Sequence, residues 1–414
     1  MNQKIAPVSA DKRLATLDIL RGFALFGILM VNMIWYSNPI ASLISDNSLW
    51  TDTQSVVTRF MIGFLFEGKF YVLFSMLFGY GFWLFLNKKN NDGKPVTGLF
   101  AMRLFVLLLI GVAHVVLLWA GDILVFYALL GFVLMLFRNV KKDRTLLIWA
   151  AVFISWPVLL MGFLALLFQI PEIQAVMDQA MVEQDAYFIS LIDKALSVFQ
   201  QGSFSEMIRM RLLEYSLSLS GFFFFHVNIL AMFLIGVYAA RKKYMARTSE
   251  LLPFFKKLCF YGFMIGIPAN LFTAIALLYH DIYSPSAISF YYMLVSSFGS
   301  PALTIAYVSG IVILIEKGVL SKLFNWLSFV GRMALTNYLL HSIIASFLFF
   351  SYGLGLFGKV NPLQSVLLVF IVYGLQIPFS IFWLKKFRFG PFEWLWRSLT
   401  YRRIQPFRKK PGSN

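Results

Sequence analysis

A histidine and an aspartate, His114 and Asp122, stand eight residues apart in an otherwise apolar part of the chain. A carboxylate beside an imidazole can fix its tautomer and raise its basicity, as general-base catalysis requires. The simpler interpretation is that Asp122 caps the next helix while His114 bonds a neighbouring backbone group. The sequence leaves both interpretations open for the pair.

A second polar set, Asp18, Arg21 and Asn32, lies near the N-terminus. At about 100° per residue the three share a helical stripe about 60° wide, with Asn32 about 21 Å beyond Asp18. On one interpretation Asn32 donates a hydrogen bond to a reacting carbonyl oxygen and Arg21 binds substrate. On the other, Asp18 and Arg21 mark the border of a membrane span and Asn32 joins two helices, as amides commonly do in membranes.

Other polar residues interrupt apolar runs or flank them, and we take them as candidate substrate-binding residues. A charge at mid-membrane costs about 2.5 to 3.5 kcal/mol on insertion scales, so such residues are functional candidates. Most of them fall in the outer half under the orientation derived below, which predicts one polar cavity opening outward with two arginines near its mouth. The candidates are Glu67, Lys69, His226, Asn337 and His341, with Arg209 and Arg211 as the arginines.

The elements that must position these residues are membrane helices. Of 414 residues, 59% are hydrophobic and 13% are charged, whereas a soluble domain carries about 25% charged residues. We therefore expect an all-α polytopic membrane protein in the cell membrane, with the lipid bilayer as partner and no nucleic acid despite the net charge of +17. Cys259 is the single cysteine, which excludes an intrachain disulfide and a cysteine metal site, and we expect no metal.

Apolar runs long enough to cross a bilayer, about 17 to 25 residues, recur along the chain. We predict about ten transmembrane helices, the fourth of them short. They lie near residues 18–36, 58–86, 99–118, 123–137, 146–168, 217–240, 258–279, 291–315, 327–350 and 363–384.

Charge distribution sets the orientation. If the N-terminus is cytoplasmic, the inner segments hold 27 Lys and Arg residues and the outer loops hold four. The positive-inside rule then places both termini in the cytoplasm. We predict one membrane domain over 1–414, comprising a cytoplasmic N-terminus (1–17), a ten-helix core (18–384) and a basic cytoplasmic tail (385–414). Within the outer loop at 169–216, Ser203 and Glu206 have capping-box spacing and predict a helix start.

Four sequence blocks form a recognisable pattern. They are 13–32 (RLATLDILRGFALFGILMVN), 66–70 (FEGKF) with 74–79, 111–114 with 121–124, and 331–338 (GRMALTNY) with 390–401. These blocks resemble the YeiB-like family of bacterial polytopic membrane proteins, known as domain of unknown function 418, and the resemblance covers nearly the whole chain in order.

The resemblance implies a function, because this family is grouped with transmembrane acyltransferases. These include the lysosomal heparan glucosaminide acetyltransferase and bacterial sugar O-acyltransferases. Asn32 falls where the bacterial enzymes place a catalytic histidine and where the lysosomal enzyme has a functional asparagine. This chain departs from both patterns, because the catalytic histidine of the lysosomal enzyme follows its asparagine shortly, whereas the first histidine here is His114. Only Arg21 and Asn32 transfer by position.

We expect an acyltransferase that moves an acyl group from a cytoplasmic acyl-CoA to an extracytoplasmic sugar or lipid hydroxyl of the cell envelope. His114 would act as general base, Asp122 as its partner and Asn32 as a donor to the carbonyl oxygen. Lysines of the inner loops, such as Lys242, would attract CoA phosphates, although anchoring on anionic lipid explains the same charges. The alternatives are a small-solute transporter that uses the buried Asp, Glu and His residues, and a non-catalytic membrane protein. The acceptor and the oligomeric state are left open.

Overall fold

The computed structural model describes residues 14–45, 47–87, 96–220, 227–279, 282 and 284–409. Regular structure within these ranges is helical, apart from one isolated bridge between Phe387 and Arg408. The expectation of an all-α membrane protein is confirmed.

The described α-helices follow the apolar runs of the sequence. They are α1 (Ala15–Ser37), α2 (Ile40–Leu43), α3 (Thr53–Leu65), α4 (Lys69–Leu86), α5 (Thr97–Leu117), α6 (Leu124–Leu134), α7 (Asp143–Leu167), α8 (Pro171–Gln201), α9 (Phe204–Ser220), α11 (Asn228–Arg241), α12 (Leu252–Tyr279), α13 (Ala287–Glu316), α14 (Ser321–Arg332), α15 (Ala334–Phe349), α16 (Pro362–Lys386) and α17 (Pro391–Thr400).

Within the part of the chain that the structure describes, seven helical segments are long and apolar enough to cross a membrane. Three shorter apolar helices, at Leu124–Asn139, Asn228–Arg241 and Ala334–Phe349, occupy the fourth, sixth and ninth predicted runs. Each of the ten predicted runs therefore contains an apolar helix among the described residues. The number of membrane crossings stays a prediction.

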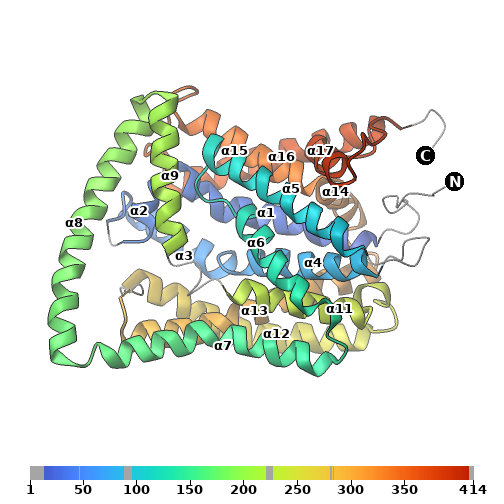
Figure 1. Cartoon of the computed structure of the whole chain (residues 1–414), viewed down its shortest axis with the longest axis horizontal. Coiled ribbons are helices and arrows are strands. Elements are labelled where there is room, and N and C mark those ends of the chain that lie inside the picture. The colour runs from blue at the N-terminus through green and yellow to red at the C-terminus, as the bar shows by residue number, and fades with distance from the viewer. Residues whose placement is uncertain are drawn as a thin grey trace.

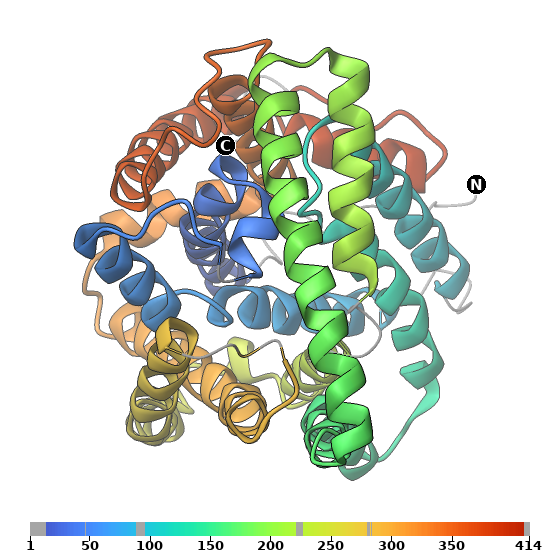
Figure 2. The same ribbon diagram turned by 90° about the vertical axis from the view of Figure 1, so that its left-hand side faces the viewer.

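The bundle helices run roughly parallel, and two ends can be distinguished (Figure 1). We call the end where α1 begins and α17 lies the inner end, following the predicted orientation. Helices α8 and α9 lie across the opposite, outer end (Figure 2). The predicted outer loop at 169–216 is thus a helical pair, and its predicted helix start is confirmed, since the Ser203 amide donates to Glu206 Oε2 at 2.7 Å.

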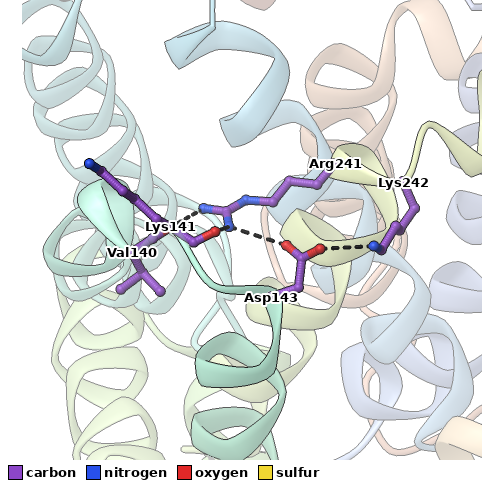
Figure 3. Close-up of polar contacts among 5 residues, drawn as sticks. All are labelled: Val140, Lys141, Asp143, Arg241 and Lys242. Atoms are coloured by element: carbon purple, nitrogen blue, oxygen red, sulfur yellow. Dashed lines mark hydrogen bonds and ion pairs between the residues drawn. The ribbon is translucent and has the colours of Figure 1, made fainter.

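Basic residues tie helices together at the inner end. Arg241 at the end of α11 donates to the carbonyl oxygens of Val140 and Lys141, and it lies 3.3 Å from the Asp143 carboxylate (Figure 3). Lys242 lies 3.0 Å from the other oxygen of Asp143. The start of α7 is therefore held to α11 by charge as well as by packing.

The second predicted span, 58–86, is not one continuous helix. It is broken between α3 and α4, where Gly68 adopts φ +82°, in the left-handed region. Two hydroxyl groups of α13 donate hydrogen bonds to backbone carbonyl groups on either side of the break. Tyr307 donates to the Leu65 carbonyl oxygen at 3.1 Å, and Thr304 donates to the Lys69 carbonyl oxygen at 2.9 Å. A broken membrane helix is tolerated where neighbouring side chains satisfy its freed backbone groups.

Glycines bring α1 and α14 into close contact. A Cβ atom on Gly22 would lie 2.1 Å from the Leu327 carbonyl oxygen, and one on Gly331 would lie 1.9 Å from that of Asp18. Small residues permit such backbone approach between membrane helices. This crossing fixes α1 near the start of α15, the two helices that frame the candidate site.

Candidate functional site

A buried chain of three side chains links α5, the α5–α6 connection and α15. His114 Nδ1 lies 2.8 Å from Asp122 Oδ1, and His114 Nε2 lies 2.7 Å from Ser342 Oγ. The three residues are 3%, 2% and 0% exposed in the order Asp122, His114 and Ser342. We call them the relay. The predicted pairing of His114 with Asp122 is present in the structure.

The two oxygens of Asp122 do different things. Oδ2 accepts a hydrogen bond of 2.7 Å from the backbone amide of Val125 in the first turn of α6, while Oδ1 faces His114. Asp122 therefore caps a helix through one oxygen and faces the imidazole of His114 through the other. The cap fixes the carboxylate, so the imidazole meets a rigid partner.

Two residues of α1 extend the relay. The Tyr36 hydroxyl lies 2.7 Å from Ser342 Oγ, and the Asn32 side chain bonds with Tyr36. The structure thus brings Asn32, His114 and Asp122 into one network, with Tyr36 and Ser342 as the connecting residues. Asn32 is half-buried, whereas Tyr36 is buried.

Aromatic rings enclose the relay. The His114 ring centroid lies 5.4 Å from that of Tyr338 and 6.5 Å from that of Trp119, which in turn packs 4.1 Å from Tyr36. Rings exclude water and lower the local dielectric constant, so charges on the relay interact more strongly than they would in solvent.

Arg211 of α9 holds the outer end of α5. Its Nη1 donates to the carbonyl oxygens of Val116 and Leu117 at 3.2 and 3.0 Å, in the same last turn of α5 as His114, and its side chain is fully buried. Such charge-assisted bonds satisfy the last carbonyl groups of a helix. Arg211 therefore positions the helix that carries His114, whereas the sequence placed it at the mouth of a cavity.

Glu214, one turn after Arg211, is buried and accepts a 3.1 Å hydrogen bond from the Ile40 amide. Burial raises the pKa of the Glu214 carboxyl to about 7, although the Ile40 amide and the Arg211 guanidinium both lower it. Burial also lowers the pKa of Arg211. Arg209 is exposed and lines a separate cavity of 230 Å³ between α8 and α9.

The main pocket lies on the inner side of the relay. It has a volume of 540 Å³ and extends from Leu14 and Tyr401 at the inner end to Ile123 and Tyr338 beside the relay. We call it the inner pocket. Helices α8 and α9 lie across the outer end (Figure 2), whereas the inner pocket reaches the relay from the inner end. The outward-opening cavity stays a prediction.

Charged side chains line the inner pocket toward its mouth. Four arginines and two carboxylates give this rim a net charge of +2, while most other lining residues are aliphatic or aromatic. The charged residues are Arg21, Arg103, Arg332, Arg397, Asp18 and Glu393. A cationic rim around an apolar bore fits a ligand that has an anionic head and a hydrocarbon tail.

Two rim carboxylates have structural partners. Asp18 Oδ1 lies 2.7 Å from Arg21 Nη1. Glu393 accepts hydrogen bonds from the backbone amides of Leu335 and Thr336 at 2.6 and 3.1 Å, and so caps the start of α15 from α17. Burial raises the pKa of Glu393, which these hydrogen bonds partly oppose. The rim is thereby tied to the helix that carries Ser342.

The remaining predicted residues lie apart from the relay. His341 Nε2 lies 2.8 Å from Gln376 Oε1, and Asn337 donates to Val330 and Ser380, so both join α15 to its neighbours. Lys69 donates to the Gly63 carbonyl at 2.7 Å and interacts with Glu67 at the α3–α4 break. His226 lies outside the described residues. Among the described residues, no cluster of His, Cys, Asp and Glu could hold a metal ion.

Sequence reasoning missed Ser342 and Tyr36. A serine in a membrane helix carries no local signal, because most bond the backbone of their own helix. Ser346 does so, donating to the Ile343 carbonyl oxygen. Tyr36 lies one turn after Asn32 on the stripe already singled out, and that spacing is the signal that could have identified it.

Comparisons with known proteins agree on one group. The family described as "Protein of unknown function (DUF418)" matches residues 239–403. The chain is 36% identical to the uncharacterized protein YxaH of Bacillus subtilis over 98% of both chains. It is 30% identical to the uncharacterized protein YeiB of Escherichia coli over 95% of this chain and 98% of that protein. No solved structure matches.

Proposed function

The chain belongs to the DUF418 family of YeiB-like membrane proteins, and we propose that it is a membrane-embedded acyltransferase of the cell membrane. The observation that carries the proposal is the relay, which lies immediately beyond the deep end of an apolar pocket with a cationic rim. Acyl transfer needs a base near the acyl carbon and a channel for the donor, and this arrangement offers both.

The inner pocket suits an acyl-CoA donor. Phosphate groups would bind the rim arginines, among them Arg21 and Arg397, and the acyl thioester would extend along the apolar wall toward Tyr338. The predicted orientation gives the pocket access to the cytoplasm, where acyl-CoA is found. The acceptor is a sugar or lipid hydroxyl of the cell envelope.

His114 is the proposed base. With Nδ1 protonated toward Asp122, Nε2 can accept the proton of a hydroxyl that attacks the thioester carbonyl. The C–S bond then breaks, and the same proton passes to the departing thiolate. Asn32 and the Tyr36 hydroxyl are the donors we assign to the negative charge that develops on the carbonyl oxygen.

The α3–α4 break favours a second candidate, a transporter. Discontinuous helices with buried charges, as at Glu67 and Lys69, form substrate or ion sites in many transporters. The two candidates differ in what they consume: an acyltransferase releases free CoA thiol, and a transporter leaves acyl-CoA intact.

The proposal can be tested with purified protein in lipid nanodiscs. The protein is mixed with acetyl-CoA or palmitoyl-CoA, and the released CoA thiol is measured. We expect slow thiol release, with water as a poor acceptor, and a decrease of about 10²- to 10⁴-fold for His114→Ala. Absence of both acyl-CoA binding and thiol release in wild-type protein would overturn the acyltransferase and favour the transporter.

Binding of the acyl-CoA donor can be tested separately with a matched pair of variants. Arg397→Gln removes a rim charge, and we expect it to weaken acyl-CoA affinity about 5- to 100-fold. Arg388→Gln removes the same charge from an exposed residue that does not line the pocket, and we expect its affinity to stay near wild type. Equal losses in both variants would mean that general surface charge attracts the donor.

A further inference from the structure

We propose that Ser342 is the nucleophile of this site and carries the acyl group as a covalent ester between donor release and acceptor attack. This inference rests on the proposed acyltransferase function and adds a two-step mechanism to it. In the simpler one-step alternative, the acceptor hydroxyl attacks the donor directly and Ser342 only orients His114.

The order and the distances of the relay atoms match those of an activated nucleophile. The distance between Ser342 Oγ and His114 Nε2 is 2.7 Å. On the other side of the imidazole ring, His114 Nδ1 lies 2.8 Å from Asp122 Oδ1. A hydroxyl, an imidazole and a carboxylate in this order form the nucleophile, base and orienting group of serine acyl-transfer enzymes, whatever their fold. The chain order of the three residues does not matter.

The hydrogen bonds of Ser342 differ from those that Ser75 and Ser346 make to their own helices. Ser75 and Ser346 each donate to a carbonyl oxygen of their own helix. Both bonds found for Ser342 are instead to side chains of other helices, His114 on α5 and Tyr36 on α1. When His114 Nε2 carries no proton, the Ser342 hydroxyl can donate to this base.

Tyr36 also contacts the Ser342 Oγ atom. Its hydroxyl lies 2.7 Å from Ser342 Oγ and can donate to it, which leaves the serine proton for Nε2. When the serine oxygen bonds to an acyl carbon, the carbonyl oxygen of that group comes within reach of the Tyr36 and Asn32 donors.

Tyr338 separates Ser342 from the donor. It lines the deep end of the inner pocket, one helical turn before Ser342 on α15, and its ring packs against His114. A thioester carbonyl at the end of the pocket would touch this ring, so Tyr338 must turn aside for the carbonyl to reach Oγ. Such side-chain rotation is a common gating motion.

Every bond that forms and every proton that moves is accounted for in the two steps. First, Ser342 Oγ bonds to the thioester carbonyl carbon, its proton moves to His114 Nε2, and the C–S bond breaks with transfer of that proton to the thiolate. Second, an acceptor hydroxyl attacks the serine ester, its proton moves to Nε2, and the bond to Ser342 Oγ breaks as Oγ regains a proton. The products are CoA thiol and an acylated acceptor.

Covalent capture tests the inference. Wild-type protein in nanodiscs is mixed with radiolabelled acyl-CoA, quenched in acid, and digested to find the acylated peptide. We expect one acyl group on Ser342, none on Ser342→Ala, and wild-type labelling of Ser346→Ala, the serine one turn further along α15. We expect thiol release by Ser342→Ala to fall at least about 10²-fold.

Ser342→Cys keeps the inference testable if Ser342→Ala does not fold. This variant should be acylated as a thioester, which neutral hydroxylamine cleaves, whereas the serine ester of the wild type resists the same treatment. If wild-type protein releases thiol and transfers acyl groups but no adduct forms, or if Ser342→Ala keeps full turnover, the nucleophile is wrong and the acyltransferase stands. If no thiol is released at all, the proposed function itself fails.

Discussion

The carboxylate of Asp122 lies 2.8 Å from His114 Nδ1 through one oxygen and caps α6 through the other. Asp122→Asn separates these roles, because asparagine caps a helix as well as aspartate does but offers an amide group to the imidazole. An amide donor would stabilise the tautomer whose Nε2 carries the proton, and that tautomer cannot act as a base.

We therefore expect Asp122→Asn to lower turnover by about 10²- to 10⁴-fold and to change the free energy of unfolding by less than about 1 kcal/mol. Asp122→Ala removes the cap as well and should also cost about 0.5 to 2 kcal/mol of stability. Thiol release and thermal unfolding of the two variants measure both effects. Unchanged turnover in Asp122→Asn would exclude the carboxylate from the reaction.

Glu214 makes stability depend on pH. Its pKa in the folded protein is about 7, above the ordinary value of 4.5, so the folded state holds the proton more tightly than the unfolded state. The stabilisation is complete below pH 4.5 and is lost as pH rises through 7.

From Glu214 alone we expect the unfolding free energy to fall by about 1 to 3 kcal/mol between pH 4.5 and 7.5, and Glu214→Gln to abolish this slope. Unfolding in detergent across this range is the measurement. Glu206→Gln serves as a control, since the bonds of this exposed carboxyl with Ser203 lower its pKa instead of raising it. A Glu214→Gln slope equal to wild type would contradict the assignment.

The α1–α14 crossing should not accept a methyl group. Gly22→Ala would place a Cβ atom 2.1 Å from the Leu327 carbonyl oxygen, and we expect a loss of about 1 to 3 kcal/mol or more. Gly374→Ala on α16 has open space around its Cβ and should gain up to about 1 kcal/mol from helix propensity. Equal unfolding temperatures for the two variants would show that the helices separate easily.

The inner pocket can be narrowed without a clash. Gly81 lines it, and a Cβ atom there meets no other atom within 4 Å. We expect Gly81→Leu to weaken acyl-CoA binding at least about 10-fold, because its side chain would occupy the bore, and to leave the fold intact. Gly374→Leu is the matched control, because the Cβ at this position also meets open space but Gly374 does not line the pocket. This variant should bind acyl-CoA with wild-type affinity. Binding measurements on both nanodisc samples decide the matter.

The orientation can be tested by labelling single cysteines in a Cys259→Ser background. Gln184→Cys on α8 should react with an impermeant maleimide added outside intact cells, and Arg403→Cys after α17 should react only in lysed cells. Both residues are exposed. The opposite pattern would reverse the assignment of inner and outer ends.

Much of the fold was predictable, because an apolar run of membrane length can satisfy its backbone only as a helix. The α3–α4 break was harder to predict, since a Gly-containing FEGKF segment also fits a continuous helix. Asn32, His114 and Asp122 could be grouped because each is costly in a membrane. Ser342 carries no such cost, and its role depends on contacts between α15, α5 and α1 that sequence spacing does not show. The neighbouring residue His341 was predicted as a site residue instead.

The position of Tyr338 has an electrical consequence. A membrane that stores a proton gradient must remain closed to ions wherever a protein crosses it, yet the inner pocket reaches deep into this bundle. Tyr338, the relay and the rings of Trp119 and Tyr36 form a closed layer next to the deep end of this pocket. Much of the membrane voltage would fall across this layer, so we expect the rate of proton movement at His114 to vary with membrane potential.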